Sequence, residues 1–273
     1  MTKAVILGCG YVGTEVARLW QPTLTVTATT TTPARVAELE AIAHRIVVLQ
    51  GRDEAALRSL LQDQEIVLLS VGARYGNYTD TYLKTAETLV AALPRCPSVR
   101  QIIYTGSYAV YGDRGGAWVD ETTPVAPANE NGEVLAATEQ VLLNAASERL
   151  KVCVFRLGGI YGPGRELVKI FGRVAGTTRP GTGEEAANWV HLDDIVGAID
   201  FARQQGLSGI YNLVGTVPLT SKELLDQVCS THHLPPVSWD PTQPSLRPYN
   251  AKVSNQKLRS AGYAFIHPEI QQF

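Results

Sequence analysis

The sequence predicts an α/β fold in which a doubly wound parallel sheet is followed by a smaller C-terminal lobe. Two observations predict this fold. The chain opens with an apolar segment, a glycine-rich turn and an amphipathic segment, which is the order strand, turn, helix. Apolar segments then alternate with helix-like segments up to residue 105, and such alternation is typical of a parallel sheet covered by helices.

The glycine-rich turn is the first chemical motif. A predicted strand over residues 4–7 leads into Gly8, Gly10 and Gly13, and a predicted helix over residues 14–20 follows. In a GxGxxG turn the first glycine permits a tight turn, the second lets a pyrophosphate approach the backbone, and the third lets helix and strand pack closely. The pattern predicts a Rossmann-type dinucleotide site, with a ligand-free glycine turn as the alternative. The cofactor-binding residues expected here are Gly8, Gly10, Tyr11, Val12 and Gly13.

The end of the second predicted strand, residues 24–28, bears on the choice of cofactor. NAD binding uses an acidic residue here to hold the ribose 2′-hydroxyl group. Residues 24–37 contain no Asp or Glu, and the first acid is Glu38. Threonine hydroxyls and Arg35 accept a 2′-phosphate without repulsion, so we expect NAD(P) with a preference for NADP. The alternative is that Arg35 is a solvated helix residue. The contacts expected here are Thr29, Thr30 and Arg35.

Further strands and helices complete the predicted sheet. The strands are expected at residues 46–49, 66–71 and 101–105, and the helices at residues 34–43, 54–62 and 82–93. Ligands of such sheets bind at the carboxyl ends of the strands. We therefore expect Asp53 beside the adenine, and cofactor contacts from Ser70, Val71 and Gly72.

Composition excludes several classes of protein. The 273 residues carry 24 basic and 26 acidic side chains, a balance that leaves no electrostatic footprint for nucleic acid. No apolar run approaches the length of a membrane span. The four cysteines form no CxxC pair and no signal peptide is evident, so we expect a cytoplasmic protein with reduced thiols and a small-molecule substrate.

Later segments show a resemblance to a known family. The segments are YTGSYAVYG at residues 104–112, FRLGGIYGPG at 155–164 and NWVHLDDI at 188–195. Together they resemble the extended short-chain dehydrogenase/reductase superfamily, in its NAD(P)-dependent epimerase/dehydratase group, whose members act largely on nucleotide sugars. The resemblance implies an NAD(P)-binding domain over residues 1–160 and a substrate lobe over residues 161–273. A strand near residues 209–213 is expected to return to the sheet.

The resemblance also implies roles for single residues. Ser107 falls on the active-site serine, which hydrogen-bonds the substrate oxygen at the reacting carbon. Thr105 and Gly106 would line the nicotinamide side, and Leu157 and Gly158 would pass near the nicotinamide amide. Tyr111 would face the substrate, and Tyr108, Tyr111 or water would carry the proton. His191 and Asp194 fall in a segment that frames the lobe, where structural roles are the preferred alternatives.

Two departures from the family pattern bear on catalysis. The family's acid/base pair is Tyr-x-x-x-Lys, in which the lysine lowers the tyrosine pKa. Asn131 and Leu135 occupy those positions here, and neither titrates. Leu7 stands where the extended family has its first glycine. The chain therefore resembles the atypical branch that lacks the pair. The leading hypothesis is an NAD(P)-dependent epimerase/dehydratase-like oxidoreductase with atypical catalytic residues, and the alternative is a non-catalytic NAD(P)-binding sensor or partner-binding protein.

The predicted lobe supplies candidates for binding an anion. Arg165, Arg179 and Arg247 could clamp a phosphate or carboxylate, and the alternative is that all three are solvated. Residues 176–183 and 235–248 are expected to be irregular, and helices are expected at residues 167–171 and 221–230. No metal site is expected. Substrate identity and oligomeric state are left open.

Overall fold

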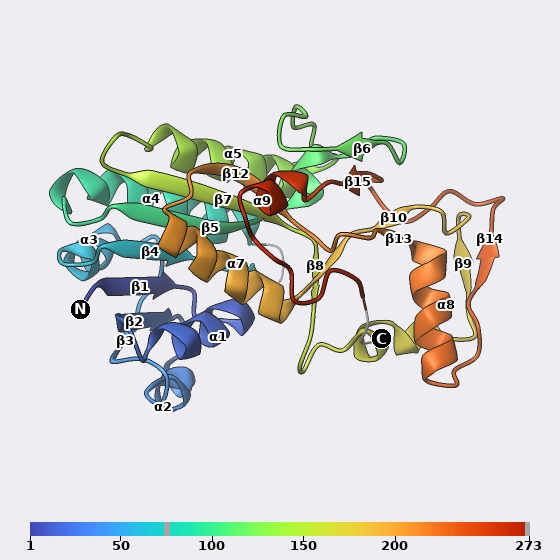
Figure 1. Cartoon of the computed structure of the whole chain (residues 1–273), viewed down its shortest axis with the longest axis horizontal. Coiled ribbons are helices and arrows are strands. Elements are labelled where there is room, and N and C mark those ends of the chain that lie inside the picture. The colour runs from blue at the N-terminus through green and yellow to red at the C-terminus, as the bar shows by residue number, and fades with distance from the viewer. Residues whose placement is uncertain (74–76, 271–273) are drawn as a thin grey trace. The chain divides into compact units, whose positions relative to one another are not determined.

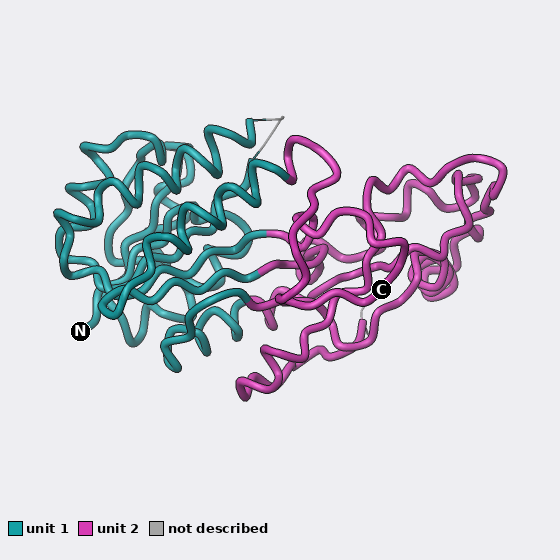
Figure 2. The backbone as a smooth tube through the Cα atoms, turned by 90° about the horizontal axis from the view of Figure 1, so that it is seen from above, with its two compact units in different colours: residues 1–106, 133–155, 196–210 teal, residues 107–132, 156–195, 211–273 magenta. Residues whose placement is uncertain are grey.

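The computed structural model of the chain describes residues 1–73 and 77–270. These residues form two compact units that alternate along the chain (Figure 2). Unit 1 comprises Met1–Gly106, Glu133–Phe155 and Val196–Ile210, and unit 2 comprises Ser107–Gly132, Arg156–Ile195 and Tyr211–Phe273. The expected division at residue 160 stays a prediction.

The central element is a parallel sheet that confirms the predicted fold class (Figure 1). Within the described residues it has seven strands in the order β12-β7-β5-β4-β1-β2-β3. Val5 pairs with Thr27 on one side and Val67 on the other, so β1 is an interior strand of the sheet, as its apolar sequence requires. The strands are β1 (Lys3–Leu7), β2 (Thr25–Thr30), β3 (Arg45–Val48), β4 (Ile66–Leu69), β5 (Gln101–Ser107), β7 (Lys151–Leu157) and β12 (Gly209–Leu213).

Helices pack against this sheet. Leu57, Leu89 and Leu142, from three different helices, are fully buried in one cluster with apolar strand residues such as Val67. Trp20 links the helix over residues 11–20 to the helix over residues 192–205, because its indole Nε1 donates to Asp200 Oδ1 at 2.8 Å. The helices are α1 (Tyr11–Trp20), α2 (Val36–Leu39), α3 (Glu54–Leu61), α4 (Thr85–Ala92), α5 (Glu130–Asn144) and α7 (Leu192–Gln205). Short 3₁₀ or π turns cover Pro33–Arg35, Thr79–Lys84, Leu93–Arg95 and Tyr108–Tyr111. None of the described helices is long and apolar enough to cross a membrane.

Unit 2 is built from short strand pairs and three helices of its own among the described residues. The helices are α6 (Leu167–Phe171), α8 (Ser221–Thr231) and α9 (Gln256–Ser260), with a 3₁₀ turn at Gly172–Val174. The strand pairs are β6 (Trp118–Val119) with β15 (Lys252–Val253), β8 (Gly159–Tyr161) with β11 (Trp189–His191), β9 (Thr178–Pro180) with β14 (Ser238–Asp240), and β10 (Ala186–Ala187) with β13 (Leu219–Thr220).

One pair corrects the sequence prediction. The segments around 178–180 and 238–240 were expected to be irregular, but Thr178, Arg179 and Pro180 pair in parallel with Ser238, Trp239 and Asp240. Both strands are three residues long and one ends in proline, so neither has the alternating pattern that identifies a strand.

The edge strand β12 has a side-chain partner for one of its backbone groups. The backbone N–H of Asn212 donates to Glu121 Oε1 at 2.7 Å, and its side-chain Nδ2 donates to Ser254 O at 2.9 Å. Burial raises the pKa of the Glu121 carboxyl group. These bonds hold the second half of β12 to segments of unit 2.

Candidate functional site

The three glycines of the first turn are needed for different structural reasons. Gly8 has a φ of +90°, and a Cβ there would lie 2.6 Å from Ser70 O. A Cβ at Gly13 would lie 2.6 Å from Gly8 O. The protein itself therefore requires glycine at both positions. A Cβ at Gly10 would meet no described atom within 4 Å, so packing does not explain this glycine. The open space beside Gly10 fits a ligand that approaches the backbone.

The N-terminal end of the helix that follows the turn has features that favour binding of an anion. Helix α1 begins at Tyr11, and Gly10 occupies its N-cap position. Among the described residues no side chain caps this end, and the first turn contains no acidic residue. Such a helix end presents backbone N–H groups and a positive dipole end. This helix end and the open space at Gly10 are compatible with a pyrophosphate, and the cofactor contacts of Gly8, Gly10, Tyr11, Val12 and Gly13 stay predictions.

Arg35 lies against the glycine turn. Its Nη1 donates to Cys9 O, and its Nη2 lies 3.4 Å from Thr14 Oγ1. The guanidinium also bonds Glu38 through Nη2 at 2.9 Å and Nε at 3.2 Å, and this pairing lowers the pKa of the Glu38 carboxyl group. Arg35 is therefore not merely a solvated helix residue.

Threonine hydroxyls complete this side of the site. Thr29 Oγ1 accepts from Gly8 N at 3.0 Å and donates to Ile6 O at 3.1 Å, which ties β2 to the turn. Thr30 Oγ1 accepts from Thr32 N at 3.1 Å. Both hydroxyls thus shape the backbone, while contact with a cofactor stays a prediction for them.

The ends of β4 and β5 meet as the parallel sheet requires. Thr105 Oγ1 donates to Ser70 Oγ at 3.2 Å. A Cβ at Gly72, two residues beyond Ser70, would meet nothing described within 4 Å, whereas a Cβ at Gly106 would lie 3.0 Å from the Tyr104 ring. Asp53 caps helix α3 by accepting from Ala56 N at 3.0 Å. The predicted cofactor contacts of Ser70, Val71, Gly72, Asp53, Thr105 and Gly106 stay predictions.

The predicted catalytic residues lie in unit 2 in different environments. Ser107 is half-buried, and its Oγ accepts from Ala109 N at 3.2 Å. Tyr108 is buried edge-on against Tyr249, with ring centroids 5.4 Å apart. Tyr111 is fully buried and its hydroxyl donates to Asn212 Oδ1 at 2.8 Å. Burial raises the pKa of Tyr111. This arrangement favours a structural role for Tyr111 over the predicted contact with substrate.

Leu157 and Gly158 are well packed, and their predicted contacts with the cofactor stay predictions. Gly158 N donates to Leu213 O at 3.1 Å, and a Cβ at Gly158 would lie 2.7 Å from Asn188 O. Leu157 is buried. On α5, Asn131 is exposed and Leu135 is buried, so the aligned acid/base positions hold no titratable group.

His191, Asp193 and His267 form a cluster in unit 2 whose donor atoms lie within 4.8 Å of one another. Asp193 Oδ2 lies 3.3 Å from His191 Nδ1 and 3.0 Å from His267 Nε2. The two imidazole centroids are 3.9 Å apart, with the ring planes tilted by 44° to each other. Asp194 accepts from the backbone N–H of Ile266 and His267. The bonds of Asp193 and Asp194 thus hold residues 266–267 to the start of α7.

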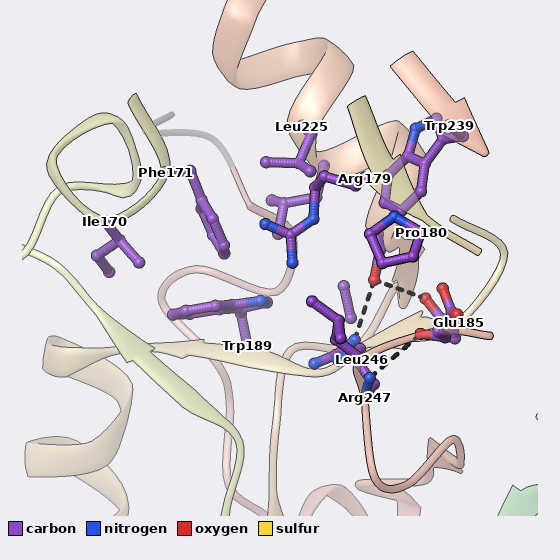
Figure 3. Close-up of a pocket in the computed structure, with 14 residues that line it drawn as sticks. Ile170, Phe171, Arg179, Pro180, Glu185, Trp189, Leu225, Trp239, Leu246 and Arg247 are labelled. Atoms are coloured by element: carbon purple, nitrogen blue, oxygen red, sulfur yellow. Dashed lines mark hydrogen bonds between the residues drawn. The ribbon is translucent and has the colours of Figure 1, made fainter. Parts of the chain in front are cut away.

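A cavity of about 240 Å³ lies wholly within unit 2 (Figure 3). Arg179 and Arg247 line it, whereas Arg165 forms a tight turn with Gly162 outside it. Arg247 Nη1 donates to Ala186 O at 2.7 Å and to Ser221 Oγ at 3.0 Å. The other lining residues are mainly apolar or aromatic: Ile170, Phe171, Pro180, Ala187, Trp189, Leu224, Leu225, Trp239 and Leu246, together with Glu185, Ser221 and Ser245.

Sequence reasoning found the two arginines but missed Glu185 and the aromatic side chains beside them. Glu185 lies directly before β10, and the aromatic residues Phe171, Trp189 and Trp239 come from α6, β11 and β14. Each is unremarkable in its own segment. No local signal identifies them, because only the tertiary fold brings them together.

Comparisons with known proteins agree with this architecture. The model of the NAD dependent epimerase/dehydratase family matches residues 4–214. Protein YeeZ of Escherichia coli (strain K12) is 34% identical over 224 residues, which cover 78% of this chain and 77% of that protein. A dTDP-glucose 4,6-dehydratase of Streptomyces griseus is 28% identical over 162 residues, 54% of this chain and 48% of the enzyme. The solved structure of MoeE5 in complex with UDP-glucose and NAD superposes with a TM-score of 0.80 at 17% identity, covering 97% of this chain and 93% of that one.

Proposed function

The chain belongs to the NAD-dependent epimerase/dehydratase family, and from that premise we propose that it is an NAD(P)-dependent oxidoreductase that acts on a nucleotide sugar. The observation that carries the proposal is Gly10. Gly8 and Gly13 are explained by packing alone, whereas the open space at Gly10 has no explanation within the protein. A dinucleotide pyrophosphate fills such a space and accepts hydrogen bonds from the N-terminus of α1.

For the cofactor we propose NADP over NAD. Arg35 is held at the glycine turn through Cys9 O, and its ion pair with Glu38 is solvent-exposed. An exposed ion pair contributes little energy, so a 2′-phosphate can compete with Glu38 for the guanidinium. Glu38 is the first acidic residue after β2, so no acidic side chain between β2 and Glu38 would repel the phosphate.

For the substrate, the cavity of unit 2 supports a nucleoside diphosphate group. Arg179 and Arg247 supply guanidinium groups of the geometry that binds phosphates. Phe171 and Trp189 pack edge to face at 5.4 Å on one side of the cavity and offer aromatic surface to a ring. A small-molecule substrate and the four free cysteines are both consistent with the proposed cytoplasmic location.

The bound nicotinamide would exchange a hydride with a hydroxyl or ketone carbon of the substrate. By family resemblance, Ser107 would donate a hydrogen bond to the oxygen on that carbon. The exposed Asn131 and buried Leu135 move no proton, and the hydroxyl of Tyr111 is bonded to Asn212. Tyr108 or water is left to carry the proton.

The absence of a titratable group at positions 131 and 135 favours a second candidate, a non-catalytic NAD(P)-binding sensor or partner-binding protein. Turnover discriminates the two. Purified protein with NADPH or NADP⁺ would be supplied with UDP-, GDP- and dTDP-sugars while the absorbance of the reduced nicotinamide is followed. Nicotinamide oxidation or reduction with any of them supports the enzyme, and dinucleotide binding without turnover supports the sensor.

A further inference from the structure

The cavity of unit 2 contains a carboxylate that the protein does not use. Glu185 is only 9% exposed and lines the cavity. Its backbone is fixed, since Ser221 N and Ser221 Oγ donate to Glu185 O at 2.8 and 3.1 Å. Within residues 1–73 and 77–270, its carboxylate has no hydrogen bond or ion pair. The side chain is largely buried, and its carboxylate oxygens are not among the fully buried atoms that lack a partner, so they stay open to the cavity and available to a ligand that donates to them.

Glu185 forms no ion pair with the two arginines of the cavity. Neither Arg179 nor Arg247 lies within ion-pair distance of its carboxylate in the part of the chain that the structure describes, although Arg247 bonds Ser221 Oγ, which in turn donates to Glu185 O. Figure 3 shows Glu185 on the side formed by Pro180 and Trp239, whereas Phe171 and Trp189 lie on the opposite side. A Cβ at Gly181 would lie 3.3 Å from Glu185 Oε1, which places the carboxylate beside that loop. The cavity therefore suits a ligand that has an anionic part and, separately, a group with N–H donors.

We propose that Glu185 selects the base of the nucleotide, and that the base is guanine. This inference rests on the proposed nucleotide-sugar function. A carboxylate only accepts hydrogen bonds, and its two oxygens suit two adjacent donors. Guanine presents N1–H and N2–H side by side. Uracil and thymine place their one N–H between two carbonyl oxygens, which a carboxylate repels, and adenine and cytosine place an acceptor nitrogen beside their amino group.

The test measures binding of nucleoside diphosphates to the full chain by calorimetry. GDP, UDP, dTDP and inosine diphosphate would be titrated, the last because its base keeps N1–H and lacks the 2-amino group. We expect GDP to bind about tenfold or more tighter than each of the others, since hydrogen bonds to a charged group are strong. This comparison needs no variant.

Two variants locate the effect. Glu185→Gln should lower GDP affinity about tenfold or more and should leave UDP and dTDP affinity unchanged or higher. Glu184→Gln, which alters the exposed neighbouring carboxylate, should leave all affinities unchanged. Thermal unfolding of both variants monitors folding.

Two results would overturn the inference while leaving the proposed function intact. One is UDP or dTDP binding as tightly as GDP, and the other is a GDP preference that folded Glu185→Gln retains. If none of the four diphosphates binds, the proposed nucleotide-sugar function fails and the base assignment fails with it.

Discussion

Replacing Gly10 by valine should abolish dinucleotide binding while leaving the fold intact. A Cβ at residue 10 would meet no described atom within 4 Å, so the free energy of unfolding should change by no more than about ±0.5 kcal/mol, as for ordinary surface changes. The valine would occupy the space proposed for the pyrophosphate. Each hydrogen bond from a helix N–H to a charged phosphate contributes about 1.5–3 kcal/mol. Loss of two such bonds weakens binding about 100-fold or more.

The matched control is Gly13→Ala, because its Cβ would lie 2.6 Å from Gly8 O and 3.0 Å from Ile6 Cγ2. Overpacking of this kind costs about 1–3 kcal/mol and should lower Tm by several degrees. Calorimetric titration with NADPH and thermal unfolding of both variants would be compared with wild type. Unchanged NADPH affinity in folded Gly10→Val would refute the assignment of the glycine turn as a pyrophosphate site.

Three further predictions concern cofactor choice, catalysis and pH. Arg35→Ala should weaken NADPH binding about 10–100-fold with little effect on NADH binding, and Glu38→Gln should strengthen NADPH binding by removing the competing carboxylate. A competition titration with both cofactors measures these affinities. A clear preference of the wild type for NADH would contradict the proposed NADP site. Whichever nucleotide sugar first shows turnover, Ser107→Ala should reduce kcat about 10²-fold, as loss of a hydrogen-bond donor does elsewhere, and equal rates would remove Ser107 from the mechanism. Burial raises the pKa of Tyr161 from 10.0 to about 12, so the folded state keeps a proton that the unfolded state releases, and stability should fall as pH rises from about 10 to about 12. Tyrosinate absorbance should therefore rise together with loss of circular dichroism, and reversible ionisation of all tyrosines near pH 10 in folded protein would disprove it.

The sheet could be predicted because its signals are local. The apolar run before Gly8 and the spacing of three glycines specify one strand, one turn and one helix, and the structure has them as β1, the turn and α1. The predicted helix over residues 34–43 was placed correctly but is shorter, since α2 ends at Leu39. Helix ends depend on which residues find burial, which a single segment does not reveal.

The cavity of unit 2 could not be predicted in the same way. Its walls come from α6, α8 and several short strands, among them β9 and β14, which pair over a separation of about 60 residues in the sequence. Glu185 follows the acidic residue Glu184 in a glycine-rich segment and reads as solvated, yet the fold buries the second of the two and exposes the first. Burial of one carboxylate out of an adjacent pair is decided by tertiary packing alone.

The bond between Glu121 and Asn212 has a consequence for self-association. An edge strand offers free backbone N–H and C=O groups to any other extended chain, which makes it a template for aggregation. In β12 the N–H of Asn212 is already occupied by the Glu121 carboxylate at 2.7 Å. A strand from another molecule would have to displace that carboxylate to add itself at this residue. Glu121 thus opposes the pairing of a further strand with β12 at Asn212. It also places a carboxylate where a second copy of the chain would have to pair.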